Sequence, residues 1–287
     1  MKPLLCLLAL GFAVLSASAG MADPVSVAYA PPKESVPLGT AFVDFDALIP
    51  RYTPVGLARA VFDAPTPTLE RFEVHITTLR PGMMSHPPHH HPWEEMLLIK
   101  EGALEVSING EKHHAGPGAL VFFASHDVHN AMNAGQVPVT YYVINFYTDL
   151  VHTVPNQPAA TQAVPGLLPS SVIDCDHLPT TPTPTGARCQ VVSSPTHTFL
   201  HLDSHITTLN PGQSTLPNMI DSGDEFFVVK TGVIEAKVNH VTCRIKAGGC
   251  FYFAPNDGRA FRNVGTTPAS YQVIKVVSDK TPATRGA

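Results

Sequence analysis

The residues best suited to chemistry stand in the histidine-rich segment His86–Glu95, which reads HPPHHHPWEE. In an extended strand, residues two apart share a face, so His89 and His91 point to one side while the histidine between them points away. A turn at the following proline and tryptophan lets Glu95 rejoin that face, and we expect His129 to arrive on a later strand across a barrel. Three imidazoles and one carboxylate suit Mn, Fe, Ni, Cu or Zn. The spacing therefore predicts a transition-metal site.

Three neighbouring side chains are candidates for proton transfer, and the sequence assigns none of them a catalytic role. Glu94 should face away from Glu95 because neighbouring residues of a strand point to opposite sides, so Glu94 is predicted to be a surface carboxylate. His86 lies at the expected mouth of the pocket. Packing is the expected role of Tyr141. The catalytic residues therefore stay unknown at this stage. The expected inward positions favour a small, partly apolar organic substrate: Met84, Leu97, Phe122, Tyr141 and Val143.

The elements that must position these residues are encoded twice. The segment HITTLRPG at 75–82 recurs as HITTLNPG at 205–212. The offset is 130 residues, and without a gap it aligns Gly56–Thr148 with Gly186–Ser278. A period this long indicates two copies of a domain rather than a solenoid, whose repeats span roughly 20–50 residues.

Each copy reads as short strands between tight turns. Asn109-Gly110 is a strong hairpin signal, and the regular spacing of the strands favours a small β-barrel or sandwich. No segment keeps a helical period, and Phe42–Ile49 holds one short helix at most because Pro50 stops it. The chain is therefore predicted to be all-β, with these strands in the first copy: Met96–Ile99, Ala103–Ile108, Ala119–Phe123 and Thr140–Tyr147.

Two motifs in the first copy resemble those of the cupin superfamily. The first cupin motif is G-x5-H-x-H-x(3,4)-E-x6-G, and its spacing is kept from His89 to Gly102, with Gly82 one residue further upstream than the pattern asks. The second is G-x5-P-x-G-x2-H-x3-N. The Gly-Pro-Gly turn at 116–118 and the pair His129 and Asn133 resemble it, with a longer interval before the histidine.

The resemblance implies a bicupin, that is, two tandem jelly-roll β-barrels. It also implies that His89, His91, Glu95 and His129 bind one divalent transition metal (Mn, Fe, Ni, Cu or Zn) in the N-terminal cupin. The expected domains are a signal peptide (1–19), an N-terminal arm (20–55), a metal-binding cupin domain (56–150), a Pro/Thr-rich linker (151–185), a second cupin domain (186–278) and a C-terminal tail (279–287).

The second copy lacks this ligand set. Met219, Asp221 and Arg259 stand at the positions of the three histidines, and only Glu225 matches a ligand of the first copy. We expect Arg259 to pair with Asp221 or Glu225 as a charge-assisted contact. The alternative is that Arg259 binds an anionic ligand. Either way, one metal ion per chain is expected.

The N-terminus predicts export. A basic start, an apolar run too short to span a membrane and an A-x-A pattern make residues 1–19 a signal peptide, so no membrane partner is expected after cleavage. A periplasmic or extracellular location permits disulfides. Cys175 with Cys189 and Cys243 with Cys250 are the expected pairs, and free buried thiols are the alternative.

Composition narrows the choice of partners. The formal net charge is −5 and no basic run is present, which argues against nucleic acid as the main partner. A small-molecule substrate is expected, for a monomer or a homo-oligomer. The favoured hypothesis is a mononuclear-metal oxidoreductase of dioxygenase type, with oxalate disfavoured because Ser85–Pro88 lacks arginine. A non-redox isomerase, lyase or hydrolase acting on a sugar or related small molecule is the first alternative, and a non-enzymatic small-molecule-binding cupin is the second.

Overall fold

The computed structural model describes residues 24–155, 164–238 and 241–282. The predicted signal peptide lies outside these ranges and stays a prediction. Within them, no helix is long and apolar enough to cross a membrane.

The described chain is built from short strands and three 3-10 turns, which confirms the all-β prediction. The elements of the first half are β1 Val25–Ser26, β2 Ala41–Val43, η1 Phe45–Ala47, β3 Arg51–Thr53, β4 Gly56–Ala64, β5 Arg71–Leu79, β6 His89–His90, β7 Glu95–Glu101, β8 Leu104–Ile108, β9 Glu111–Ala115, β10 Leu120–Phe123, β11 His129–Met132, β12 Val139–Tyr147 and η2 Asp149–His152. Those of the second half are β13 Ser171–Ile173, η3 Cys175–His177, β14 Thr181–Thr183, β15 Gly186–Ser194, β16 His201–Leu209, β17 Asp224–Thr231, β18 Val233–Val238, β19 Val241–Lys246, β20 Cys250–Phe253, β21 Arg259–Asn263 and β22 Ala269–Val277.

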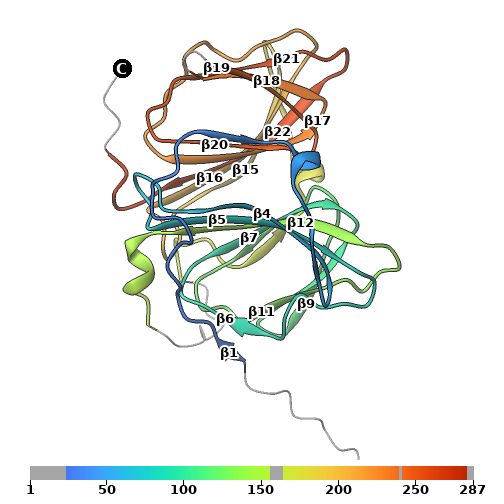
Figure 1. The fold of residues 1–287 in the computed structure, drawn as a ribbon, viewed down its shortest axis with the longest axis vertical. Helices are drawn as coiled ribbons and strands as arrows, with labels where there is room; N and C mark the ends of the chain where they lie inside the picture. Colours follow the sequence, from blue (N-terminus) through green and yellow to red (C-terminus); the bar gives the residue numbers. More distant parts are fainter. Residues whose placement is uncertain (1–23, 156–163, 239–240, 283–287) are drawn as a thin grey trace, which may run out of the picture.

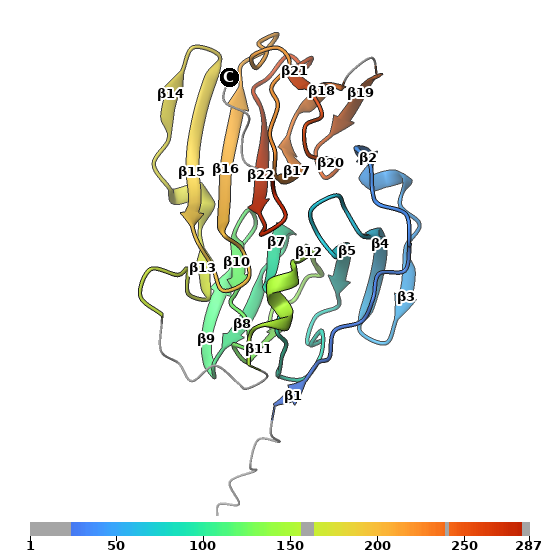
Figure 2. The same cartoon turned by 90° about the vertical axis from the view of Figure 1, so that its left-hand side faces the viewer.

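These strands form two barrels, each closed by a large and a small sheet. In the first barrel a seven-stranded sheet (β13-β10-β7-β12-β5-β4-β3) faces a five-stranded sheet (β1-β6-β11-β8-β9). In the second barrel the seven-stranded sheet β14-β15-β16-β22-β17-β20-β2 faces the three-stranded sheet β19-β18-β21. The barrels are stacked with their seven-stranded sheets toward each other (Figures 1 and 2).

The three largest hydrophobic cores of the described residues follow from this stacking. One fills each barrel, and the third lies between the two large sheets. Phe72 illustrates the third core, because its ring stacks on Phe146 of its own barrel and meets Phe226 and Tyr252 of the other. Strands with a core on both faces have no polar side, so β12 is buried at every residue.

The two halves exchange an arm. Strand β2 precedes the first barrel in sequence but pairs with β20 of the second, and β13 pairs with β10 of the first. The structural repeat therefore begins at Ala41 and Ser171, upstream of the sequence repeat, and the N-terminal arm and the linker both contribute strands. This exchange ties the barrels into one unit.

The predicted disulfides are not formed, and the four cysteines of the described chain are free thiols. Cys250 belongs to the core between the barrels, whereas Cys243 packs against the core inside the second barrel, so a sheet separates them. Cys175 and Cys189 share the inter-barrel core as unpaired side chains. Burial raises the pKa of Cys175 to about 11, which keeps it a thiol at neutral pH.

Candidate metal centre

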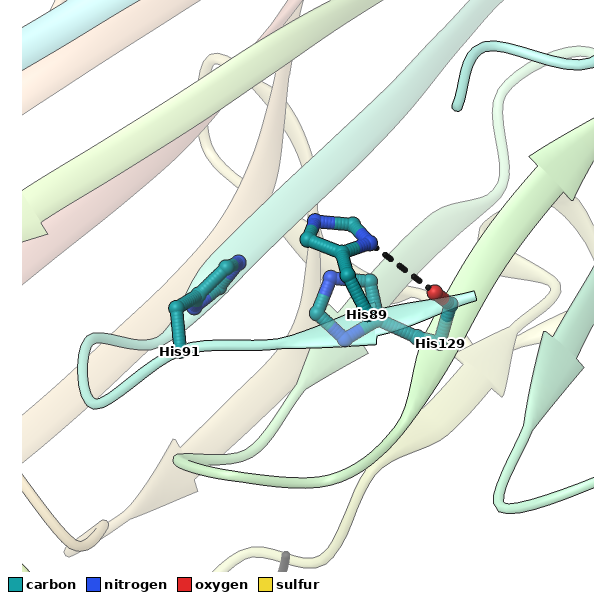
Figure 3. Close-up of side chains that lie close together, drawn as sticks. All are labelled: His89, His91 and His129. Atoms are coloured by element: carbon teal, nitrogen blue, oxygen red, sulfur yellow. Dashed lines mark hydrogen bonds between the residues drawn. The ribbon is translucent and has the colours of Figure 1, made fainter. Parts of the chain in front are cut away.

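The three predicted histidines meet inside the first barrel. The ligand atoms of His89, His91 and His129 lie within 4.8 Å of one another, and Figure 3 shows the rings gathered around one point. His89 and His129 are direct partners on the adjacent strands β6 and β11. The expectation that His129 sits across the barrel was wrong, because β11 returns beside β6 within the same sheet.

Backbone carbonyls fix the orientation of all three rings. The Nδ1 atom of His89 lies 3.2 Å from the carbonyl oxygen of His129, the Nδ1 of His91 lies 2.8 Å from that of Trp93, and the Nδ1 of His129 lies 2.8 Å from that of Asp127. A carbonyl only accepts, so each Nδ1 carries the hydrogen and each Nε2 keeps its lone pair. The three rings therefore present a basic nitrogen to the same space.

Glu95 completes the group as predicted. It begins β7, and its Oε2 lies 3.7 Å from Nε2 of His91. Burial by itself raises the pKa of a carboxyl, but the contact with His91 and the charges that His129 and His91 carry when they are protonated hold the pKa of Glu95 at about 2. The carboxylate is therefore ionised at neutral pH.

His89 and His129 stay neutral at the same pH. Burial lowers the pKa of His89 to about 4, assisted by repulsion from His86 and His91. Burial also lowers the pKa of His129 well below its usual value. Neutral imidazole is the form that binds a metal ion.

A divalent transition metal fits these residues. The Nε2 atoms of His91 and His129 are buried and have no hydrogen-bond partner. Unsatisfied buried nitrogens are costly in a native protein and call for an explanation, such as an ion. Three nitrogens and one carboxylate oxygen form the kind of donor set that such a metal prefers.

Two aromatic rings support the histidines. Trp93 stacks on His91 with the planes 3° apart, and Phe123 stacks on His129 at 13°. Because Phe123 pairs directly with Glu95 across β10 and β7, both side chains point into the barrel. The expectation that Phe122 points inward was wrong, since Phe122 lies in the core between the barrels.

A cavity of about 390 Å³ opens beside the histidines. Most of its wall is apolar, with Leu57, Leu97, Tyr141 and Val143 among the lining residues. Among the described residues, no lysine or arginine lines it. The cavity can therefore hold a small organic molecule, and it offers an anionic one neither lysine nor arginine among the described residues.

His75 is a functional candidate that the sequence reasoning missed. It lines the cavity on β5, and its Nδ1 lies 2.7 Å from Oε1 of Glu73. Burial favours the neutral ring, but the hydrogen bond and the charge of Glu73 raise the pKa of His75. Asn145 donates to the other carboxylate oxygen at 2.8 Å. The sequence did carry a signal, because Glu73 stands two residues before His75 and therefore lies on the same face of the strand.

Glu94 was expected at the surface and is instead completely buried. Its carboxylate accepts hydrogen bonds from Thr196 Oγ1 at 2.5 Å, Thr198 Oγ1 at 2.8 Å and the His197 backbone N–H at 2.8 Å. All three donors belong to the second barrel. Burial raises the pKa of Glu94 to about 7 despite these bonds. The second barrel thus fixes the position of Glu94, the residue that directly precedes Glu95.

The structure also shows where the remaining predicted residues lie. His86 lines the cavity, with its ring centroid 4.0 Å from that of His89. Tyr141 is buried and lines the same cavity. His90 points away from the three histidines, as expected, and its Nδ1 lies 3.0 Å from that of His126.

The second barrel replaces the metal group with ion pairs. A guanidinium nitrogen of Arg259 contacts the Glu225 carboxylate, and both side chains are buried. Lys275 Nζ lies 2.6 Å from Asp221 Oδ2. Burial lowers the pKa of Arg259 to about 10, so it stays charged at neutral pH. Arg259 therefore pairs with Glu225, which is one of the two carboxylates that the sequence offered as its partner.

Comparisons with known proteins agree with this architecture. The family model described as a cupin domain matches twice, over residues 75–145 and 205–275. No curated protein sequence matches the chain. Among solved structures, the chain is similar to AerE from Microcystis aeruginosa, with a TM-score of 0.60 and 12% identity over 83% of this chain and 99% of that one.

Two further structures share the fold. One is a protein described as glyoxylate-induced from Pseudomonas aeruginosa (TM-score 0.64, 16% identity, 91% of this chain and 99% of that one). The other is a mutant of the oxalate decarboxylase OxdC from Bacillus subtilis (TM-score 0.61, 15% identity, 86% of this chain and 79% of that one). The chain therefore belongs to the cupin superfamily, and its two tandem cupin domains make it a bicupin.

Proposed function

We propose that this protein is an exported, mononuclear metal-dependent enzyme, an oxidoreductase of dioxygenase type acting on a small, uncharged organic substrate. The observation that carries the proposal is the convergence of three lone-pair Nε2 atoms and one ionised carboxylate beside an apolar cavity. Export rests on the sequence pattern of residues 1–19 alone.

His89, His91, His129 and Glu95 would hold the metal. A metal ion held there supplies Lewis-acid or redox chemistry to a substrate in the cavity. The chain's own contribution is orientation, because the carbonyl partners of the three Nδ1–H groups prevent the rings from turning. The stacked rings of Trp93 and Phe123 keep bulk water from the outer faces of His91 and His129.

The lining of the cavity restricts the substrate. Leu97, Val143 and Tyr141 offer an apolar surface to its body. A dianion such as oxalate would need a cationic side chain in addition to the metal, and neither lysine nor arginine is found among the described residues that line this cavity. The likeness to an oxalate decarboxylase therefore extends to the fold, and we propose a neutral substrate.

A second candidate function is a non-redox isomerase, lyase or hydrolase. The observation that favours it is the pair of His75 and Glu73, a carboxylate-oriented imidazole on the wall of the same cavity. Such a pair transfers protons at near-neutral pH, which isomerases and lyases require. In the dioxygenase, the same pair would position a substrate hydroxyl.

Metal identity combined with oxygen uptake tests the proposal. The purified protein is analysed for bound metal, and oxygen consumption is followed while a panel of small neutral phenols and diols is added. Fe, Cu or Mn together with oxygen consumption supports the dioxygenase. Zn without oxygen consumption supports the non-redox alternative, and a protein without stoichiometric metal contradicts both.

A further inference from the structure

The second barrel keeps a cavity although it lacks the metal ligands. This cavity measures about 650 Å³, compared with about 390 Å³ for the cavity beside the histidines. It lies at the corresponding place, since Tyr271 and Val273 of β22 line it as Tyr141 and Val143 of β12 line the first. A barrel that served only as a cover would gain stability by filling such a space.

The two cavities differ in charge. The second cavity is lined by Arg188 where the first has Ala58. The other two cations of the second cavity are neutralised, Arg259 by Glu225 and Lys275 by Asp221. Arg188 forms no hydrogen bond or ion pair within the described part of the chain. Asp203 also lines the cavity and interacts electrostatically with Arg188, but its two carboxylate oxygens are engaged by Gln190 and His205, so the N–H donors of Arg188 stay available to a ligand.

A buried donor in the same cavity also lacks an acceptor. The Nε–H of Arg259 is buried and makes no hydrogen bond, although the terminal nitrogens of that side chain are engaged. Arg259, Arg188 and the buried Tyr271 line the same cavity. A bound anion can therefore accept a hydrogen bond from the free N–H groups of Arg188 or from the Nε–H of Arg259.

Apolar surface accompanies these donors. Phe227 and Val273 line the cavity wall. Leu216 and Ile220 lie at the mouth and are 76% and 59% exposed. Large exposed aliphatic side chains next to a cavity are typical of a ligand-binding site. The ligand should therefore carry an apolar body as well as a negative charge.

We propose that the second barrel binds a small organic carboxylate, with its charged group at Arg188 and its apolar body against Phe227, Leu216 and Ile220. A carboxylate matches the planar fork of a guanidinium with two parallel hydrogen bonds. The site is separate from the metal centre and does not depend on the function proposed for the first barrel.

Benzoate is a suitable probe, and benzamide is its uncharged counterpart. Binding of each is measured by calorimetry on the full protein, both after treatment with a chelator and after loading with Zn²⁺. We expect benzoate to bind in both preparations and benzamide to bind at least tenfold more weakly, since charge-assisted hydrogen bonds are roughly twice as strong as neutral ones.

Substitutions locate the site. Arg188→Ala removes an exposed side chain, so the fold should survive, and it should weaken benzoate binding about tenfold, as expected for the loss of a hydrogen bond to a charged group. Arg244→Ala is the matched control, because Arg244 is an exposed arginine of the same barrel that pairs with Glu235 outside the cavity. It should leave binding unchanged.

Three results would overturn the proposal. They are the absence of saturable benzoate binding at millimolar concentration, equal affinity in the Arg188→Ala protein, and binding that disappears with the chelator. The last result would assign the carboxylate to the metal of the first barrel.

Discussion

The contact between Glu94 and the second barrel predicts that the metal centre depends on its neighbour. Replacing Thr196 and Thr198 with valine removes both hydroxyl donors to the buried carboxylate and leaves backbone N–H groups, that of His197 among them. Each hydrogen bond to a charged group contributes about 1.5 kcal/mol, so the free energy of unfolding should fall by about 3 kcal/mol. Because Glu94 directly precedes Glu95, the metal ligand should lose its fixed position.

Metal affinity is the quantity that separates this effect from simple destabilisation. Disturbing a group that orients a metal ligand lowers metal affinity by about 10–100-fold, and we expect the lower end for a sequence neighbour. Chelator-treated protein is titrated with Co²⁺. The fluorescence of Trp93, the single tryptophan of the chain, reports binding because its ring stacks on His91. Denaturant unfolding of the metal-free protein gives the stability.

The internal repeat supplies a matched control. Asp224 is the counterpart of Glu94, and its carboxylate accepts hydrogen bonds from Thr68 of the first barrel and, at 2.5 Å, from the Tyr252 hydroxyl. Thr68→Val therefore weakens the same interface on its metal-free side and should lower stability without changing Co²⁺ affinity. Equal affinities in the Thr196→Val/Thr198→Val and Thr68→Val proteins would refute the reasoning.

Three further results are expected. Burial raises the pKa of Asp224, so the folded state binds the proton of this carboxyl more tightly than the unfolded state does. The contribution of the protonated carboxyl to stability is therefore lost as pH rises through the folded pKa. Asp224→Asn should flatten the pH dependence of denaturant unfolding, and an unchanged slope would contradict this. Phe72→Ala should lower the free energy of unfolding by about 4 kcal/mol, because it opens a cavity between the barrels; a loss below about 1 kcal/mol would mean that this core does not hold them together. Of the four cysteines Cys175 to Cys250, only Cys243 is not buried, so it alone should react with a thiol reagent in the native protein, and slowly at neutral pH because burial raises its pKa to about 11. All four should react after unfolding without reductant, and fewer thiols would restore the disulfide hypothesis.

Features that depend on neighbouring residues were predictable from the sequence. The two-residue period of a strand was enough to place His89 and His91 on one face and His90 on the other. The internal repeat gave the two barrels, and the motif spacing brought Glu95 and His129 to the same group. These signals survive because a strand fixes them locally.

Features that depend on contact between the barrels were not predictable. The strand Leu120–Phe123 is buried on both faces, so its sequence does not show that Phe123 points into the barrel and Phe122 away from it. Glu94 looks like a surface residue on its own strand, because the three groups that bury it lie about 100 residues further along the chain. The exchange of β2 and β13 between barrels has the same cause, since pairing between distant strands leaves no local pattern.

The central claim is that the first barrel alone holds one metal ion on its three histidines and Glu95. The direct measurement is the metal content of the purified protein by mass spectrometry, beside that of the His91→Ala and His113→Ala proteins. His113 lies on β9 outside the group of three histidines and serves as the control. We predict close to one metal ion per chain in the native and His113→Ala proteins and a loss of metal in His91→Ala. A native protein with no metal or with two ions per chain, or a His91→Ala protein that keeps its metal, would contradict the account.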